Sequence, residues 1–308
     1  MARKAQALGL AFFLLGVAIA AWGQGKSLNR IVSEKLVGKI HRSLITESVK
    51  VSPDGKRVAY VAVVGNEQLV IVDGKEKQYD GILGGTPIFS SDTQRAAYGV
   101  RIGNKWFVVV GEKEEKQYDG VGSLIFSPDS ERVAYVAAVG NKQSVVVDGK
   151  EGKPYDRLGA PVFSPDSKRV AYVAVVGNKG LVVVDEKEGK QYDGVIDPAF
   201  SPDSNRLAYV AFITGGLFSA DKWFVVVDGK EDKQYDGILG APTFSQDSQR
   251  VTYGAKKGNK WFAVVDGEDG PQYDAFFRER RIVFDRPDSF HYLVQKGSEI
   301  YLVEERIE

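Results

Sequence analysis

The side chains best suited to chemistry in this chain are its carboxylates, because the other usual catalytic groups are scarce. The 308 residues include 41 Asp and Glu, 41 Lys and Arg, two His and no Cys. The lack of Cys excludes disulfides, thiolate metal sites and a cysteine nucleophile. A Ser-His-Asp site needs an oriented histidine, and His41 and His291 have no Gly-x-Ser-x-Gly elbow to serve. We therefore predict no catalytic residue, no metal ligand and no cofactor.

Most of the aspartates recur at fixed places, in Ser-Pro-Asp, Asp-Gly and Tyr-Asp sequences. Turns favour Asp and Ser because these side chains bond to the backbone that follows them, and Asp-Gly between two strands is a strong signal for a tight hairpin. A calcium site needs several converging oxygens, and the Asp-x-Asp-x-Asp-Gly loop is missing from the sequence. These aspartates are therefore predicted to build structure.

The elements that hold these residues form one repeated unit. The stretch 126–135, Phe-Ser-Pro-Asp-Ser-Glu-Arg-Val-Ala-Tyr, recurs almost unchanged at 163–172 and 200–209, and looser copies start at Val51, Phe89, Phe244 and Phe284. The repeat is about 37 residues long, and such a period indicates stacked supersecondary units. The first serine of the motif recurs at Ser52, Ser90, Ser127, Ser164, Ser201 and Ser245.

Each unit is predicted to contain four short antiparallel strands. A strand ends at Phe-Ser, the second is Arg-Val-Ala-Tyr-Val-Ala, the third is a run such as 145–147, and the fourth carries Tyr-Asp. Four strands in about 40 residues are typical of a propeller blade. We predict an all-β, seven-bladed β-propeller, with six blades as the alternative. The seventh unit supplies strands at 282–284, 291–294 and 300–303 only, so we expect residues 39–45 to close this last blade as its outer strand.

The motif Ser-Pro-Asp-Gly-Lys-Arg-Val-Ala-Tyr at 52–60, with its copies, resembles the WD-like repeat of the TolB and tricorn N-terminal propellers. The resemblance covers roughly residues 47 to 303. It implies a propeller fold, and it leaves scaffold, binding module and substrate gate open as functions, because one fold hosts many activities.

The first residues are typical of an export signal. Arg3 and Lys4 precede an uncharged, largely apolar stretch, 5–25, that ends in small residues. We predict a signal peptide over residues 1–23, with an uncleaved N-terminal anchor as the alternative, an extension over 24–38 and the propeller over 39–308. The protein is then exported, to the periplasm or the cell exterior.

Function is sought where the repeats differ. One third-strand position holds Gln or Gly in some units and Trp in others, an insertion of six residues lies between strands two and three of the fifth unit, and 275–281 replaces a small connection with Phe and Arg. Aromatic and Arg side chains dominate binding interfaces. Turns between strands two and three should share one face with the blade-to-blade connections. The predicted binding residues on that face are Phe218, Trp223, Trp261, Phe276, Phe277, Arg278 and Arg280.

These patterns predict a non-catalytic, protein-binding or scaffold module of the cell envelope, a monomer whose partner is another envelope protein or a peptide segment. The balanced charge speaks against nucleic acid, and membrane contact is expected only through an uncleaved N-terminal segment. The alternative is an envelope hydrolase acting on glycan or peptide, with a carboxylate site in the propeller axis lined by Asp197, because abundant Asp and Glu always permit some pair at the needed separation.

Overall fold

The structure is a computed structural model that describes residues 31–37, 39–216, 220–277 and 282–308. The chain divides into two units, Met1–Leu36 and Val37–Glu308, and the second contains every strand described. The helical element of the described residues is one 3-10 turn, η1 (Thr46–Ser48). The predicted signal peptide, 1–23, and most of the predicted extension, 24–38, lie outside the described residues.

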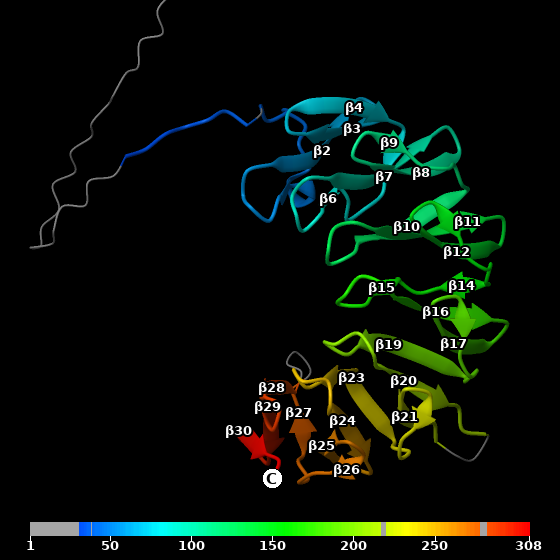
Figure 1. Cartoon of the computed structure of the whole chain (residues 1–308), viewed down its shortest axis with the longest axis vertical. Helices are drawn as coiled ribbons and strands as arrows, with labels where there is room; N and C mark the ends of the chain where they lie inside the picture. Colours follow the sequence, from blue (N-terminus) through cyan, green and yellow to red (C-terminus); the bar gives the residue numbers. More distant parts are fainter. Residues whose placement is uncertain (1–30, 38, 217–219, 278–281) are drawn as a thin grey trace, which may run out of the picture. The chain divides into compact units, whose positions relative to one another are not determined.

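The second unit is built from seven antiparallel sheets that follow one another in chain order, called blades 1 to 7 here (Figure 1). Blade 1 comprises β1 (Lys50–Val51), β2 (Val58–Val64), β3 (Glu67–Val72) and β4 (Lys75–Tyr79); blade 2 comprises β5 (Gly81–Ile82), β6 (Ile88–Phe89), β7 (Ala96–Ile102), β8 (Lys105–Val110) and β9 (Lys113–Glu114). Blade 3 comprises β10 (Gly120–Phe126), β11 (Val133–Val139), β12 (Lys142–Val147) and β13 (Lys150–Glu151); blade 4 comprises β14 (Arg157–Leu158), β15 (Val162–Phe163), β16 (Val170–Val176), β17 (Lys179–Val184) and β18 (Lys187–Glu188).

The remaining blades repeat this order. Blade 5 comprises β19 (Gly194–Phe200), β20 (Leu207–Ile213), β21 (Lys222–Val227) and β22 (Lys230–Glu231); blade 6 comprises β23 (Gly237–Phe244), β24 (Val251–Lys257), β25 (Lys260–Val265) and β26 (Glu268–Asp269); blade 7 comprises β27 (Ala275–Phe276), β28 (Val283–Arg286), β29 (Ser289–Lys296) and β30 (Glu299–Arg306). The predicted seven-bladed β-propeller is confirmed as the fold class, and the six-bladed alternative is not.

Turn residues explain why each unit folds as a meander. In blade 3, the Ser127 hydroxyl donates to Asp129 and accepts the backbone N–H of Arg132 at 2.9 Å, which closes the turn between the first two strands. Asp148 and Gly149 both have positive φ, 53° and 80°. Positive φ at both central residues defines the hairpin turn that matches strand twist. The predicted hairpins at Asp-Gly are therefore confirmed.

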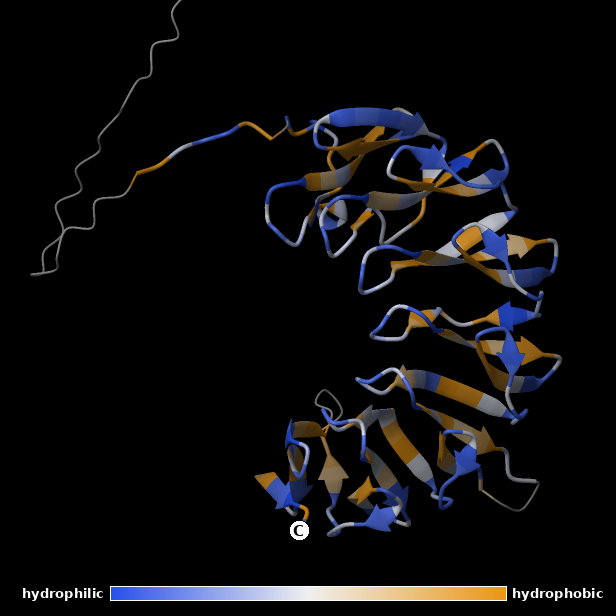
Figure 2. Ribbon diagram, in the orientation of Figure 1, coloured by the Kyte–Doolittle hydropathy of each residue, from blue (hydrophilic) through white to orange (hydrophobic). Residues whose placement is uncertain are grey.

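The hydrophobic core lies between successive blades. One cluster combines Val210 and Val225 of blade 5 with Tyr253 and Phe262 of blade 6, and each of these side chains is at most 2 % exposed. Figure 2 shows hydrophobic residues along the middle strands and hydrophilic ones at the turns and outer strands. Because a sheet that lies between two others is covered on both faces, its middle strands are continuous apolar runs rather than alternating ones.

The prediction that residues 39–45 form the outer strand of the last blade is wrong. Leu44 forms a bridge with Ala62 of β2, and Ile45 donates its N–H to Val61 at 2.9 Å. The reason is local: β1 has two residues and leaves the second half of β2 without an inner partner, so the chain just upstream supplies one. Blades 2 and 4 solve the same problem with a split inner strand, β5/β6 and β14/β15.

In the last blade, no strand of the described residues fills the fourth, outer position, and the three-strand count of this unit agrees with the sequence prediction. Strands β27 and β28 share the inner position beside β29, and β30 pairs with the other side of β29. Among the described residues, no strand pairs with the free edge of β30. Ile300 and Leu302 of β30 are accordingly 65 % and 59 % exposed.

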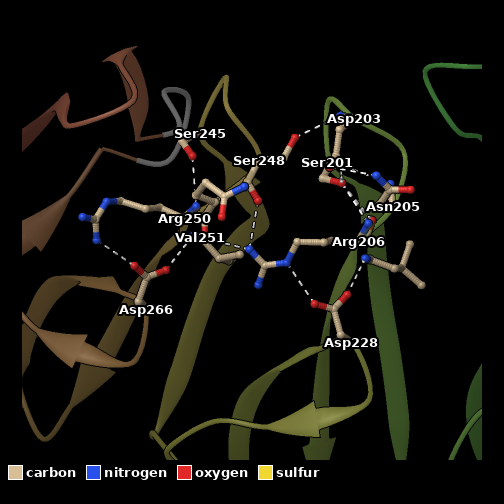
Figure 3. Close-up of polar contacts among 12 residues, drawn as sticks. Ser201, Asp203, Asn205, Arg206, Asp228, Ser245, Ser248, Arg250, Val251 and Asp266 are labelled. Carbon is tan, nitrogen blue, oxygen red and sulfur yellow. Dashed lines mark hydrogen bonds and ion pairs between the residues drawn. The ribbon is translucent and has the colours of Figure 1, made fainter.

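Polar side chains connect consecutive blades at the edge that carries the Ser-Pro-Asp turns (Figure 3). Arg206 of blade 5 donates from Nε to Asp228 at 2.9 Å and from Nη1 to the carbonyls of Ser248 and Gln249 in blade 6, at 2.9 and 2.7 Å. Its guanidinium also lies 5.3 Å from the ring centre of Phe244. In return, the Ser248 hydroxyl accepts the N–H of Asp203 at 2.9 Å. This contact is called the arginine clamp below.

The arginine clamp recurs with the motif. Arg57, Arg132 and Arg169 make the same three kinds of contact, to an Asp of their own blade, to two carbonyls of the next blade and to a Phe ring there. Two arginines depart from it. Arg95 of blade 2 contacts the Ser130 carbonyl and the Phe126 ring of the next blade, but Gly111 stands in place of the Asp of its own blade. Arg250 of blade 6 differs in the opposite way. It donates to Asp266 at 3.0 Å, and within the described part of the chain it makes no hydrogen bond to blade 7.

We predict that Arg206→Ala lowers the free energy of unfolding by about 2 kcal/mol, because hydrogen bonds from a charged donor to partly buried carbonyls are lost. Arg250→Ala is the matched control. It removes a surface ion pair alone, so about 0–1 kcal/mol is expected. Urea unfolding of both variants, followed by circular dichroism, gives the two values. Equal losses would show that the contacts to the next blade contribute nothing.

Candidate functional site

The opposite edge of the blades carries the turns between second and third strands, and it is called the turn edge. Asp236, of the Tyr-Asp pair that ends blade 5, accepts from Lys222 Nζ at 2.8 Å and from the N–H of Gly258 in blade 6 at 2.8 Å. The blade-to-blade connections therefore start beside the turns of the next blade, as the sequence predicted. The same arrangement holds at Asp119, Asp156, Asp193 and Asp274.

The carboxylates that could do acid–base chemistry are engaged in these contacts. The hydrogen bond from Lys222 is the main cause that lowers the pKa of Asp236, and the hydrogen bond from Ser201 lowers the pKa of Asp203 to about 2. Both groups stay ionised at neutral pH, so neither can donate a proton there. The structure thus gives the recurring aspartates the turn and blade contacts that the sequence predicted.

The tyrosines of the Tyr-Asp pairs join blades along their outer side. The Tyr118 hydroxyl donates to Glu151 of the next blade at 3.0 Å, and Lys116 reaches the same carboxylate at 2.6 Å. Burial is the main cause that raises the pKa of Tyr118 to about 12. Tyr155 with Glu188 and Tyr192 with Glu231 repeat the contact at 2.9 Å. These tyrosines are structural donors rather than reactive phenols.

The two predicted tryptophans lie on the turn edge, in adjacent blades. Trp223 of β21 stacks on Phe212, with ring centres 4.5 Å apart, and Trp261 of β25 faces Lys256, whose Nζ is 5.8 Å from its ring centre. Both are partly buried, and each packs against the cluster shared with the next blade. Trp223 and Trp261 therefore combine a contact to the neighbouring blade with an exposed part.

The other predicted binding residues fall into two groups. Phe276 is 8 % exposed and stacks on Tyr292 at 4.9 Å, so it belongs to the core between blades 6 and 7 and not to the surface. Its neighbour Phe277 is 37 % exposed. Phe218, Arg278 and Arg280 lie outside the described residues.

The two histidines are not brought together. The backbone N–H of His41 donates to the Tyr60 hydroxyl beside blade 1, whereas His291 of blade 7 bonds through Nδ1 to Asp285 at 2.9 Å. In the described ranges, no group of three or more His, Asp and Glu residues is arranged to hold a metal ion.

Asp197 is exposed and occupies a bulge of β19 with φ of 55°. Within the described inner strands, the acidic residues are Asp197 of β19 and Asp285 of β28. Ser123 and Gly240 adopt the same positive φ at the bulges of β10 and β23. The backbone conformation at Asp197 is therefore a feature of the repeat and no sign of a special site.

Sequence reasoning missed two grooves between blades. One of about 500 Å³ lies between blades 3 and 4, and one of about 320 Å³ lies between blades 5 and 6. The sequence signal that could have indicated a difference between the two grooves is one repeat position, which holds Gly152 in one unit and Asp232 in another.

The sheet topology defines a β-propeller, and its turn edge carries tryptophans in adjacent blades. No family model and no curated protein sequence matches the chain. Among solved structures, it is similar to TolB from Acinetobacter baumannii, with 18 % identity over 69 % of this chain, 62 % of that one and a TM-score of 0.36. The chain thus spans less than two thirds of the length of that TolB.

Two further structures are similar to the chain. A eukaryotic initiation factor has 12 % identity over 84 % of this chain and 78 % of its own, with a TM-score of 0.49. The β-propeller domain of the Trilobed protease from Pyrococcus furiosus has 13 % identity over 88 % and 97 %, with a TM-score of 0.40. A search of the described residues for a helix long and apolar enough to cross a membrane finds none.

We predict that the protein loses stability in acid because the aspartates of its Tyr-Asp pairs have lowered pKa values in the folded state, as at Asp119, Asp156 and Asp236. Such groups stabilise the fold fully above their unfolded pKa, about 4, and the stabilisation is lost as pH falls through the folded pKa. The melting temperature should be constant from about pH 7 to 5 and fall below about pH 4.

The Asp156→Asn variant is the control for that cause. It keeps an oxygen for the N–H of Gly177 but loses the charge that Lys142 pairs with at 2.6 Å. Its melting temperature should be lower at pH 7 and should fall less between pH 5 and 3 than that of the parent. An unchanged acid profile in this variant would assign the acid sensitivity to other groups.

Proposed function

We propose that this chain is an exported, non-catalytic β-propeller that binds another envelope protein, or a peptide segment of one, as a monomer in the periplasm or outside the cell. Binding takes place at the turn edge of blades 5 to 7. The described residues of this surface are Phe212, Trp223, Trp261 and Phe277, and it is called the aromatic surface. Phe218, Arg278 and Arg280 extend it along the sequence.

The observation that carries the proposal is the use of Trp where the fold does not require it. At the same position in blades 1 and 3, Gln68 and Gln143 accept the N–H of Ile82 and Leu158 in the next blade, each at 2.7 Å. Gly180 takes the position in blade 4. Since the fold accepts Gln or Gly at this position, the Trp side chain is available for contact with a binding partner. Partly exposed aromatic residues are enriched at protein interfaces.

The chemistry of the repeats supports binding over turnover. The recurring aspartates and glutamates are ion-paired or hydrogen-bonded within or between blades. The acidic residues of the described inner strands are Asp197 of β19 and Asp285 of β28, which belong to blades 5 and 7. Glycoside hydrolysis needs two carboxyl groups at a defined separation. Export rests on the order of charged, apolar and small residues in 1–23.

We predict that Trp261→Gln weakens capture of the partner from an envelope extract at least tenfold, since an aromatic residue at the centre of an interface contributes about 2 kcal/mol or more. Blades 1 and 3 have Gln at this position, so the variant should remain folded, and a thermal melt of the variant would show this. The captured proteins are quantified by mass spectrometry against the parent chain.

Trp106→Gln is the matched control. Trp106 occupies the same position in blade 2 with Arg101 5.8 Å from its ring centre, but blade 2 is not part of the aromatic surface. Capture should be unchanged in this variant. If both variants capture as well as the parent, or if both lose capture equally, the aromatic surface of blades 5 to 7 is not the binding site.

A further inference from the structure

The last residue of the second strand changes its chemistry along the turn edge. Blades 6 and 7 have Lys257 and Lys296 at this position, where each lies opposite the first residue of the third strand. Blades 1 to 5 have an aliphatic residue there, and these residues are between 42 and 60 % exposed: Val64, Ile102, Val139, Val176 and Ile213. The turn edge therefore changes from apolar to cationic between blades 5 and 6.

The residue just before this position changes in the same way. Lys256 lies opposite Trp261 in blade 6, whereas blade 5 has Phe212 opposite Trp223. Blade 2 has the one other cation at this position in the described blades, Arg101, and its guanidinium donates to two backbone carbonyls at 2.9 Å each. Among the described residues Lys256 has no such acceptor, so its charge is available to a partner.

Lys256, Lys257 and Lys296 are called the lysine cluster here. Within the described ranges, none of them makes an ion pair or a side-chain hydrogen bond. The Nζ of Lys296 lies 5.0 Å from the ring centre of Tyr273. Lys257 lies directly opposite Lys260, and like charges directly opposite each other destabilise a sheet. Folding therefore does not account for a lysine at position 257.

The described acidic residues of this edge are engaged elsewhere. Asp236 and Asp274 each accept from another lysine, at 2.8 and 2.5 Å, and Glu299 accepts a tyrosine hydroxyl of its own strand. The hydrogen bond from Lys222 is the main cause that lowers the pKa of Asp236, and the charge of Lys256 is the smallest cause. An excess of positive charge thus remains on the described turn edge of blades 6 and 7.

The turns that carry the lysine cluster are fixed beside the aromatic surface. Asp236 accepts the backbone N–H of the residue after Lys257 at 2.8 Å, and Asp274 accepts that of the residue after Lys296 at 2.6 Å. Each of these carboxylates also bonds to the preceding blade, so the turn of blade 6 lies next to blade 5 and that of blade 7 next to blade 6. The lysine cluster therefore continues the aromatic surface.

We propose that the partner segment bound at the aromatic surface is acidic, with an apolar side chain on the stacked rings of Trp223 and Phe212 and carboxylates at the lysine cluster. This inference rests on the proposed function and names the chemistry of its partner. Complementary charge steers a partner and fixes its register more than it adds affinity, and a single exposed ion pair contributes little. Three lysines beside a pair of stacked rings favour a segment that combines both features.

The test is fluorescence polarisation of a fluorescein-labelled peptide, in which a leucine pair precedes a run of glutamates, titrated with the full chain. We expect this peptide to bind, and a peptide with glutamines in place of the glutamates to bind at least about tenfold more weakly. Added sodium chloride should weaken binding of the glutamate peptide, because salt screens exposed charges.

A triple variant connects binding to the lysine cluster. Lys256→Gln, Lys257→Gln and Lys296→Gln together should weaken binding of the glutamate peptide at least about tenfold. Blade 7 has Gln295 at the position of Lys256, so the variant should remain folded, which a thermal melt checks. The matched control removes the same charge from three exposed fourth-strand lysines without ion pairs in the described chain, and it should bind like the parent: Lys77→Gln, Lys187→Gln and Lys230→Gln.

Three results would overturn the acidic partner: equal binding of the glutamine peptide, equal binding by the two triple variants, or tighter binding of heparin, a sulfated polysaccharide without apolar side chains, than of the glutamate peptide. The proposed function is judged separately by capture with Trp261→Gln. Loss of capture in that variant without binding of the glutamate peptide would leave the aromatic surface as the binding site and refute only the acidic partner. Unchanged capture in that variant would refute the proposed function, and this inference with it.

Discussion

Lateral attachment of each sheet to the next is the constraint on which the rest of this structure depends. A four-stranded sheet with apolar side chains on both faces cannot be stable alone, so every blade must be covered by its neighbours. The chain fixes these contacts at both edges with charged groups. The arginine clamp reaches backbone carbonyls of the next blade, as at Arg206 and Ser248, and the Tyr-Asp carboxylates reach backbone N–H groups, as at Asp236 and Gly258.

This use of polar residues explains why the most frequent potential catalytic groups are poor candidates for catalysis. A carboxylate that joins two blades has its lone pairs engaged and its pKa lowered, as at Asp119. Positions whose residue type changes from blade to blade join the blades in some repeats and not in others. The third-strand position shows the difference: Gln143 accepts a hydrogen bond from Leu158 of the next blade, whereas Trp223 stacks on Phe212 of its own blade.

The sequence predicted the periodic part of the fold and missed what departs from the period. Repeated Ser-Pro-Asp and Asp-Gly turns were enough to predict seven units, their strand order and the incomplete last blade. Spacing says nothing about which strand a non-repeated segment will pair with, so residues 39–45 were assigned to the wrong blade. Phe276 was misread for a similar reason: its stacking on Tyr292 follows from the approach of blade 7, which no local pattern encodes.

The grooves between blades show how repeats can acquire separate roles without changing the fold. The tyrosine of the second strand is fixed by packing, but its acceptor is not, because Asp232 accepts from Tyr253 and Glu305 accepts from Tyr292, and these two carboxylates come from different elements of the chain. Gly152, which has no side chain to act as an acceptor, makes the same backbone hydrogen bond to its third strand as Asp232 does. The residue at this repeat position can therefore differ between blades while the backbone contacts of the blade stay the same.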